Sequence, residues 1–203
     1  MLAPLSWLKE CVDIKLSPKE LAEKLTEVGL GVGKITKTAD DTIFELEITP
    51  NRPDCLSIIG IAREIAAVEG KKIKFPFSAS QGETLQGKPT KILPLEIKTD
   101  HTINPRFTGI IIDGITVKDS PNWLKQRLTK IGQRPINNIV DITNYVMLEL
   151  GNPIHAFDYN KINNHTMLVT QTKGGELFKS VDGISYHLPK GAVIIKDSEN
   201  IID

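Results

Sequence analysis

The stretch from Arg134 to Asp158 combines several side chains that could do chemistry. Its sequence is RPINNIVDITNYVMLELGNPIHAFD. Side-chain amides, an aspartate, an arginine and a histidine surround an apolar stretch with helical spacing. Each polar group that such a helix buries must find a hydrogen-bond partner or lower the stability of the fold. We therefore interpret this stretch as one wall of a binding site rather than as an ordinary core helix.

The beginning of this stretch predicts a capped helix. Arg134 precedes a proline and so lies in a stiff entry segment. Asn137 and Asn138 are candidate caps for the helix that follows, and Asp141 and Asn144 are expected on its more polar side. The asparagines are therefore candidates both for capping and for lining a site.

The end of the stretch places His155 after a Gly-Asn-Pro break. A lone histidine usually has a structural role, but at this position residue chemistry alone leaves the structural and functional interpretations equal. The break favours a position at the mouth of a cleft, and Asp158 could orient the imidazole. His155 is therefore a candidate catalytic residue.

A second polar cluster is ITPNRPDCLS, from Ile48 to Ser57. Asn51 and Asp54 could cap the following helix, and Arg52 could pair with a local carboxylate. This structural interpretation is favoured. The alternative is that Arg52 presents an exposed guanidinium to a carboxylate or phosphate of a ligand.

Several classes of function are not indicated. The sequence has no glycine-rich phosphate loop, no HExxH motif and no serine hydrolase elbow. None of the four histidines has a second His or Cys at metal-ligand spacing, so we expect no metal site. Lys plus Arg and Asp plus Glu both number 25, which argues against non-specific binding of nucleic acid.

The cellular setting is predicted from cysteine usage and hydropathy. Cys11 and Cys55 form no paired motif and are expected to be reduced thiols in an intracellular protein. No apolar run approaches membrane-spanning length, so we expect no membrane partner and a cytoplasmic location.

The pattern of elements predicts an α+β fold, with a small N-terminal helical and β module and a mixed α/β second domain. The boundaries predicted are residues 1–70 for the module, 71–94 for a linker and 95–203 for the second domain.

Ser17 and Glu20 form a capping box around Pro18. Ser120 is the expected cap of a helix over 121–131. Predicted helices and strands are, in order, 5–12, 18–28, 42–48 (strand), 57–68, 95–97 (strand), 107–117 (strand), 121–131, a helix ending at Gly151, and strands at 167–171, 176–181 and 186–195.

Three long motifs carry a resemblance to a known family. They are MLAPLSWLKECVDI, ELEITPNRPDCLSIIGIAREIAAVEG and RPINNIVDITNYVMLELGNPIHAFD. In the same order, they resemble the N-terminal portion of the phenylalanyl-tRNA synthetase (phenylalanine–tRNA ligase) beta subunit of bacterial type. The resemblance covers almost the whole chain.

The resemblance implies an aminoacyl-tRNA synthetase. In this family the beta subunit joins an alpha subunit in an α2β2 assembly that attaches phenylalanine to tRNA(Phe), using ATP and magnesium. The fragment itself is expected to hold no cofactor and to be inactive in aminoacylation alone. Its second domain would be the editing domain (B3/B4-like), which hydrolyses tyrosine misattached to the same tRNA.

Carried over residue by residue, the resemblance assigns the editing pocket to Arg134 and His155 as catalytic residues. Asn137, Asn138 and Asn144 lie in the same motif as substrate-binding candidates. The family's usual glutamate, which reads the tyrosine hydroxyl, is replaced at its expected place by Ser185. A serine can still hydrogen-bond a phenol, but more weakly than a carboxylate does.

Two further departures from the family pattern bear on activity. The chain ends at Asp203, before a glycine-rich segment expected to complete the pocket, so a C-terminally truncated editing domain is expected. The RNA-binding barrel commonly inserted near residues 33–40 is missing. The alternative function is therefore a non-catalytic module that binds tRNA or acts as a subunit scaffold, with editing lost.

Overall fold

The computed structural model describes residues 1–75, 92–180 and 183–202. Most of the predicted 71–94 linker lies outside the described residues, as does Val181, the last residue of one predicted strand. The chain forms two compact units, each continuous in space but not in sequence. The first comprises Met1–Leu85 and Thr116–Ala156, and the second comprises Gln86–Ile115 and Phe157–Asp203. The mixture of helices and small sheets confirms the α+β class.

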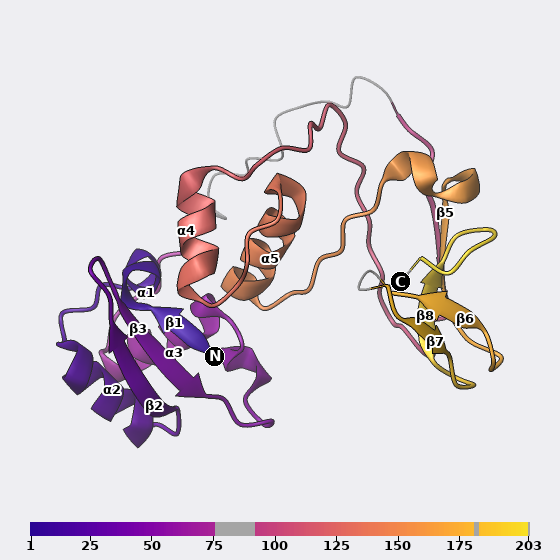
Figure 1. Cartoon of the computed structure of the whole chain (residues 1–203). Coiled ribbons are helices and arrows are strands. Elements are labelled where there is room, and N and C mark those ends of the chain that lie inside the picture. Colours follow the sequence, from indigo (N-terminus) through magenta and orange to yellow (C-terminus); the bar gives the residue numbers. More distant parts are fainter. Residues whose placement is uncertain (76–91, 181–182, 203) are drawn as a thin grey trace. The chain divides into compact units, whose positions relative to one another are not determined.

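The first unit holds all five described α-helices and one sheet (Figure 1). Its elements are β1 (Leu2–Pro4), α1 (Leu5–Cys11), α2 (Pro18–Glu27), β2 (Gly31–Lys37), β3 (Thr42–Glu47), the 3-10 turn Pro53–Cys55, α3 (Ile58–Val68), α4 (Asn122–Lys130) and α5 (Asn138–Leu150). β3 lies between β1 and β2 and is antiparallel to both.

The predicted capping box of α2 in the first unit is confirmed. The Ser17 hydroxyl accepts the Glu20 N–H, and the Glu20 carboxylate accepts the Ser17 N–H, which completes the capping box of α2. The α3 helix begins after Ser57, whose hydroxyl accepts the Gly60 N–H. The expectation that Asn51 or Asp54 caps this helix is therefore wrong, because Ser57 already occupies the N-cap position.

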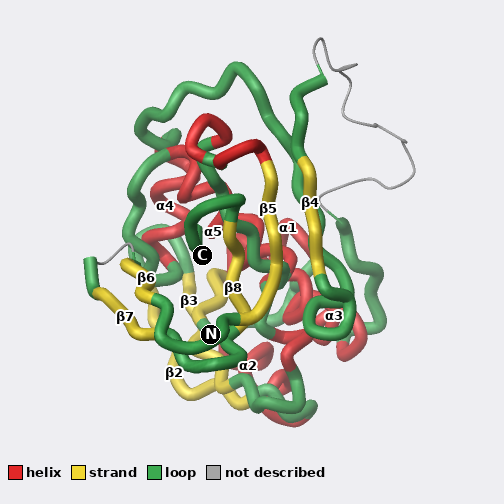
Figure 2. The backbone as a smooth tube through the Cα atoms, turned by 90° about the vertical axis from the view of Figure 1, so that its right-hand side faces the viewer, coloured by secondary structure: helices red, strands yellow, loops and turns green. Residues whose placement is uncertain are grey.

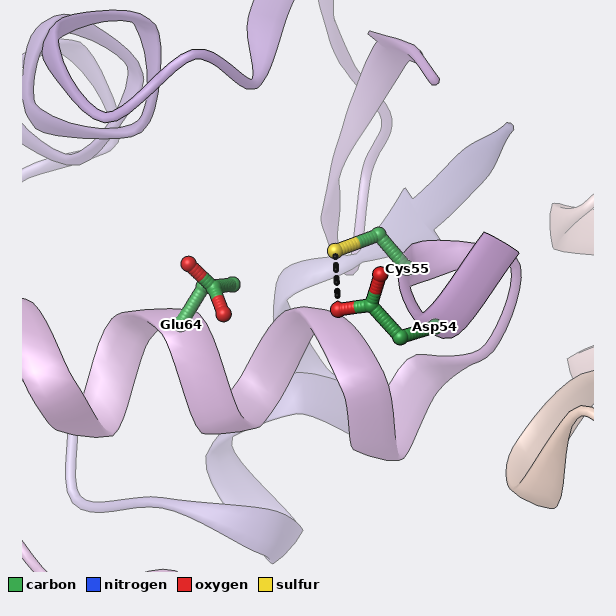
Figure 3. A group of neighbouring side chains, drawn as sticks. All are labelled: Asp54, Cys55 and Glu64. Atoms are coloured by element: carbon green, nitrogen blue, oxygen red, sulfur yellow. Dashed lines mark hydrogen bonds between the residues drawn. The ribbon is translucent and has the colours of Figure 1, made fainter. Parts of the chain in front are cut away.

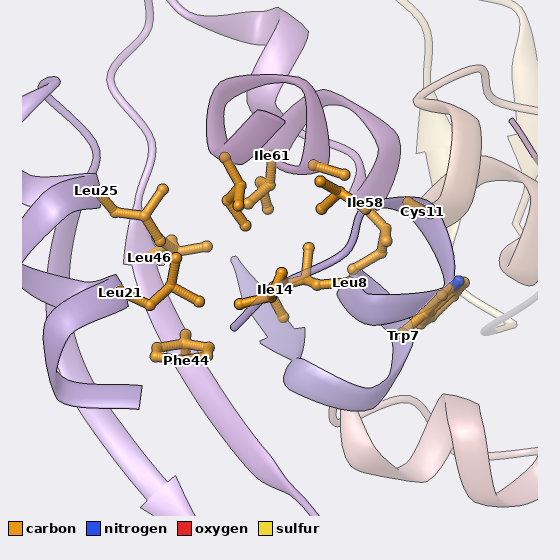
Figure 4. Close-up of a cluster of buried hydrophobic side chains, with 14 of the residues drawn as sticks. Trp7, Leu8, Cys11, Ile14, Leu21, Leu25, Phe44, Leu46, Ile58 and Ile61 are labelled. Carbon is orange, nitrogen blue, oxygen red and sulfur yellow. The ribbon is translucent and has the colours of Figure 1, made fainter. Parts of the chain in front are cut away.

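One hydrophobic core joins the N-terminal elements of the first unit to α4. Figure 4 shows Leu21 and Leu25 of α2, Phe44 and Leu46 of β3, and Ile61 of α3 pointing into the same interior. Leu124 and Leu128 add the buried face of α4 to it. The α4 and α5 helices, which the prediction placed in its 95–203 domain, thus belong to the first unit of the structure. The predicted boundaries themselves stay a prediction.

The second unit is built from short strands. They are β4 (Glu96–Thr99), β5 (Thr166–Gln171), β6 (Leu177–Lys179), β7 (Ser185–His187) and β8 (Val193–Lys196). Two 3-10 turns, Tyr159–Lys161 and Asn163–His165, precede β5. β5 pairs in parallel with β4 and antiparallel with β8, and the three strands lie side by side in Figure 2. β6 and β7 form a separate antiparallel pair.

Two strand predictions in this region are wrong. Residues 107–117 form no described strand, and Ile110 and Ile112 are each 67% exposed instead of buried. An apolar run predicts a buried strand only where neighbouring strands exist to cover it, and none pairs with this segment. The single strand predicted over 186–195 is two strands, β7 and β8, separated by the turn at Gly191, which has φ +85°.

Candidate functional site

The α5 helix and its flanking loops carry most of the predicted site residues. Asn137 is the N-cap, because its Oδ1 accepts the N–H groups of Ile139 and Val140, both at 3.0 Å. The helix ends at Gly151, which adopts the left-handed conformation with φ +79°. The prediction of a capped helix that ends at the glycine is confirmed.

Asn138 uses its side chain to join two segments rather than to cap the helix. Its Oδ1 accepts the N–H of Lys118 at 2.9 Å, and its Nδ2 donates to the carbonyl of Thr116 at 3.1 Å. Its own N–H donates to the carbonyl of Lys118. The expectation that Asn138 caps α5 is corrected in this way, and its amide is largely engaged in holding the segment before α4.

The sequence predicted Asp141 on the more polar side of α5, but the structure buries it. Its side chain is 0% exposed. Ser120 donates to Oδ2 at 2.5 Å and the N–H of Ile136 donates to Oδ1 at 2.8 Å. Ser120 is consequently not the cap of α4, which begins after Pro121 without a side-chain cap. A hydroxyl and an amide satisfy the buried carboxylate, which explains how an acid is tolerated there.

A second buried carboxylate, Glu149, lies near the other end of α5. The Tyr145 hydroxyl donates to its Oε1 at 2.7 Å, and the Trp7 indole N–H donates to the same oxygen at 3.3 Å. Burial, together with the bond to Glu149, raises the pKa of Tyr145 to about 12, so this phenol stays a donor. The Trp7 and Tyr145 rings are stacked with centroids 5.1 Å apart. These contacts bind α5 to α1.

Arg127 of α4 completes this aromatic cluster. Its guanidinium carbon lies 4.8 Å from the centroid of the Trp7 ring, it donates to the Tyr145 hydroxyl, and it forms an ion pair with Glu10. The sequence analysis singled out neither Arg127 nor Glu149. No local signal marks them, because their partners are up to 142 positions away in the chain.

Arg134 and His155 lie in loops attached to opposite ends of α5, and both are exposed. The 13 residues of the helix span about 20 Å. Asn144 lies within the helix and is half-buried. The structure thus presents the arginine and the histidine from the two ends of one rigid element.

Ser185 belongs to the second unit, at the start of β7, where it pairs with Lys179 of β6. It is exposed. Asp158, which the sequence offered as a partner of His155, is in the same unit as Ser185 and caps the first 3-10 turn by accepting the N–H of Asn160.

Arg52 pairs with a local carboxylate, as the favoured interpretation of its sequence expected. Arg52 donates to both oxygens of Asp54, at 3.0 and 2.8 Å, and forms an ion pair of 2.9 Å with Glu64. The Arg52 hydrogen bonds lower the pKa of Asp54 to about 2. Burial and the hydrogen bond to Asp54 raise the pKa of the Cys55 thiol to about 11.

Asp54, Cys55 and Glu64 also form a group with metal-ligand atoms within 4.8 Å of one another, drawn in Figure 3. Arg52 donates to Asp54 and Cys55 and pairs with Glu64, so a guanidinium already provides the positive charge that a cation would bring. The thiol, with its raised pKa, is a poor ligand because metals bind the thiolate. The group therefore does not fit magnesium or another divalent metal.

Among the described residues, no helix is both long and apolar enough to cross a membrane.

Comparisons with known proteins identify the family. The phenylalanine–tRNA ligase beta subunit of Thermotoga maritima is 44% identical over 176 residues, which are 86% of this chain and 22% of that protein. That of Geobacter sulfurreducens is 46% identical over 159 residues, 77% of this chain and 19% of the relative. The family model of the B3/4 domain matches residues 103–203. The chain belongs to the phenylalanine–tRNA ligase beta subunit family.

The match to this family runs through nearly the whole chain. The beta subunit of Rhodopirellula baltica is 37% identical over 198 residues, which cover 98% of this chain and 29% of that protein. The chain therefore spans less than a third of the length of these family members. A solved N-terminal fragment of the phenylalanyl-tRNA synthetase beta subunit from Pyrococcus horikoshii has a TM-score of 0.49 at 15% identity, covering 100% of this chain and 60% of that one. That likeness is too weak to carry an argument.

Proposed function

We propose that this chain is part of a phenylalanine–tRNA ligase and that its B3/4 region removes tyrosine misattached to tRNA(Phe). The observation that carries the proposal is the match of the B3/4 model to residues 103–203 in a chain whose relatives are beta subunits of this ligase. The reaction is hydrolysis of the ester between tyrosine and the tRNA.

Such an activity has a physical cause. A pocket that binds phenylalanine can reject tyrosine only through one added hydroxyl. A hydrophobic pocket discriminates poorly against a substrate that merely adds a hydroxyl. A second site that recognises the hydroxyl removes the wrong product. Hydrolysis by a positioned water requires orientation and electrostatic stabilisation rather than a covalent nucleophile.

The roles proposed for individual residues come from the family resemblance, and the exposure and hydrogen bonds of these side chains are compatible with them. Arg134 holds the tRNA end, and His155 contacts the substrate or the attacking water; both side chains are exposed. Ser185 hydrogen-bonds the tyrosine hydroxyl. Asn137 and Asn138 shape the wall, since their amides already bind backbone groups. Asn144 is the remaining substrate-binding candidate.

The wider assembly is also part of the proposal. The chain works with the alpha subunit in an α2β2 ligase in the cytoplasm and contacts tRNA(Phe). ATP and magnesium act in parts of that assembly outside this chain.

The proposal is tested by deacylation of Tyr-tRNA(Phe) with the full-length beta subunit assembled with its alpha subunit. His155→Ala is expected to lower the rate about a hundredfold, within the range for a positioned acid–base or water-orienting group. His101→Ala is the matched control, because His101 is also exposed and contacts the carbonyl of Pro105. It should retain the parental rate, and both variants should aminoacylate normally.

A second variant tests the position of Ser185. Ser185→Glu restores a carboxylate and should accelerate hydrolysis of Tyr-tRNA(Phe) about tenfold, because a charged acceptor binds a phenol more strongly. Equally slow hydrolysis by the parent, by His155→Ala and by Ser185→Glu would instead favour the alternative, a non-catalytic tRNA-binding or scaffold module. This alternative is supported by the exposed Ser185, which lies where the family resemblance leads us to expect an acid.

A further inference from the structure

The four-residue segment from Gln133 to Ile136, which carries Arg134, is held at both of its ends. On one side, the Gln133 N–H donates to the carbonyl of Leu128, at the end of α4, at 2.9 Å. On the other side, the Ile136 N–H donates to Asp141 Oδ1 at 2.8 Å. Arg134 therefore lies between two fixed backbone groups.

The sequence between these two anchors leaves little freedom. Pro135 fixes its own φ and has no N–H to donate. It also restricts the preceding residue, Arg134, to extended conformations. The Asp141 carboxylate thus joins the far end of this stiff segment to α5.

The anchor is itself rigid. Asp141 is fully buried, and its second oxygen accepts the Ser120 hydroxyl, so the carboxylate cannot rotate away without losing both bonds. Asn138 ties the same part of α5 to Lys118 and Thr116. The start of α5, the segment before α4 and the Arg134 loop therefore form one hydrogen-bonded unit.

We propose that Asp141 is a positioning residue for Arg134: its buried carboxylate holds the loop that presents the guanidinium to the substrate. This inference rests on the proposed function, because it assigns Asp141 a role in Tyr-tRNA(Phe) hydrolysis through Arg134. Asp141 touches no substrate. Its effect is to keep a long, rotamer-rich side chain attached to a fixed backbone, so that less freedom is lost on binding.

The test compares Asp141→Leu, Arg134→Ala and the double variant in the full α2β2 protein. Leucine keeps the branched shape and the number of heavy atoms of the aspartate, with bulkier methyl groups, but accepts no hydrogen bond. We expect each single variant to raise KM for Tyr-tRNA(Phe) deacylation about tenfold with little change in kcat. The double variant should be no worse than Arg134→Ala, because the anchor acts only through the arginine.

Two controls separate positioning from general destabilisation. Asp141→Asn should restore the parental KM, because an amide oxygen still accepts from Ile136 and its NH2 can donate to Ser120. Asp119→Ala removes an exposed carboxylate, paired with Lys125, from the segment that also contains Ser120. It should leave KM unchanged.

Amide hydrogen exchange of residues 131–137 provides a readout that does not depend on activity. Asp141→Leu should accelerate exchange in this segment, whereas Arg134→Ala should not. Losses that add in the double variant, or parental exchange and KM in Asp141→Leu, overturn the inference. Parental deacylation by Arg134→Ala together with faster exchange in Asp141→Leu instead overturns the proposed function of Arg134 and leaves the anchor established.

Discussion

The two units differ in how they gain stability. In the first unit, long-range contacts bury one continuous core that includes Trp7, Phe44 and Leu128. In the second unit, the buried hydrophobic residues among the described positions are Ile162, Met167, Val169 and Ile194. The second unit relies more on paired short strands and on loop hydrogen bonds. Proposed site residues lie in both units: Arg134 and His155 in the first, and Ser185 in the second.

The comparison extends to the environment of the site residues. Arg134 and His155 flank α5, which has two buried carboxylates: Asp141 connects the helix to the segment before α4, and Glu149 connects it to α1. Ser185 lies in β7, which pairs with β6. Each strand has three residues, and all three residues of β7 are exposed. We therefore expect substitutions near α5 to disturb the packing of the first unit. Substitutions near Ser185 should affect only their immediate surroundings.

The largest expected difference concerns core packing. Leu128→Ala, at a side chain that is 0% exposed, should lower the free energy of unfolding by about 3 kcal/mol, because it leaves a cavity in the core. Val193→Ala in β8, at a side chain that is 55% exposed, should change it by about 0.5 kcal/mol or less. Urea denaturation of both variants measures this difference. Equal losses would show that the units do not differ in this way.

Thiol reactivity gives the next largest effect. Cys11 and Cys55 are buried in the first unit, and burial first of all raises the pKa of each to about 11. Relative to the ordinary thiol pKa of 9.0, the thiolate fraction at pH 8 falls about a hundredfold. Ser185→Cys places an exposed thiol in the second unit, and it should react rapidly with a thiol reagent while the buried native cysteines react far more slowly.

The reaction of the native cysteines also has an expected pH dependence. Because the thiolate is the reacting form, the rate at Cys11 and Cys55 should rise tenfold per pH unit up to about pH 11, whereas that of the exposed thiol should level off near its ordinary pKa. Rapid labelling of native Cys55 at pH 8 would contradict its burial in the first unit.

The smallest effect compares two caps. Asn137→Ala removes the side-chain cap of a 13-residue helix and should cost about 1 kcal/mol of stability. Asp158→Ala removes the cap of a three-residue 3-10 turn in the second unit and should cost about half as much or less. Thermal unfolding of the two variants checks the order. A larger loss for Asp158 would indicate that its turn supports more of the second unit than its length suggests.

Much of the fold was predictable because the signals are local. The capping box at Ser17, the helix that Asn137 caps and the helix stop at Gly151 each depend on residues within a few positions. Residues 107–117 were mispredicted because an apolar run does not say whether a neighbouring strand exists. Ser120 was assigned as a cap because its distant partner, Asp141, is not visible from the local pattern.

The site was predictable only in part. Family motifs point to Arg134, His155 and Ser185, and their roles stay a prediction. The sequence predicted that Arg52 pairs with a local carboxylate, and Asp54 is such a partner. The second partner, Glu64, lies in α3 and was not predicted. Glu149 and Arg127 were missed because their partners are distant in sequence.

The sequence alone determined the family, the α+β class and the helices that begin and end at clear caps, since these depend on long motifs and on short-range hydrogen bonds. Only the tertiary structure decided that Asp141 is buried rather than exposed and that it holds the Arg134 loop. The physical reason is that the cost of burying a carboxylate depends on donors supplied by other segments, here Ser120 and Ile136. A helical pattern records which residues share a face, but not which other segments will satisfy them.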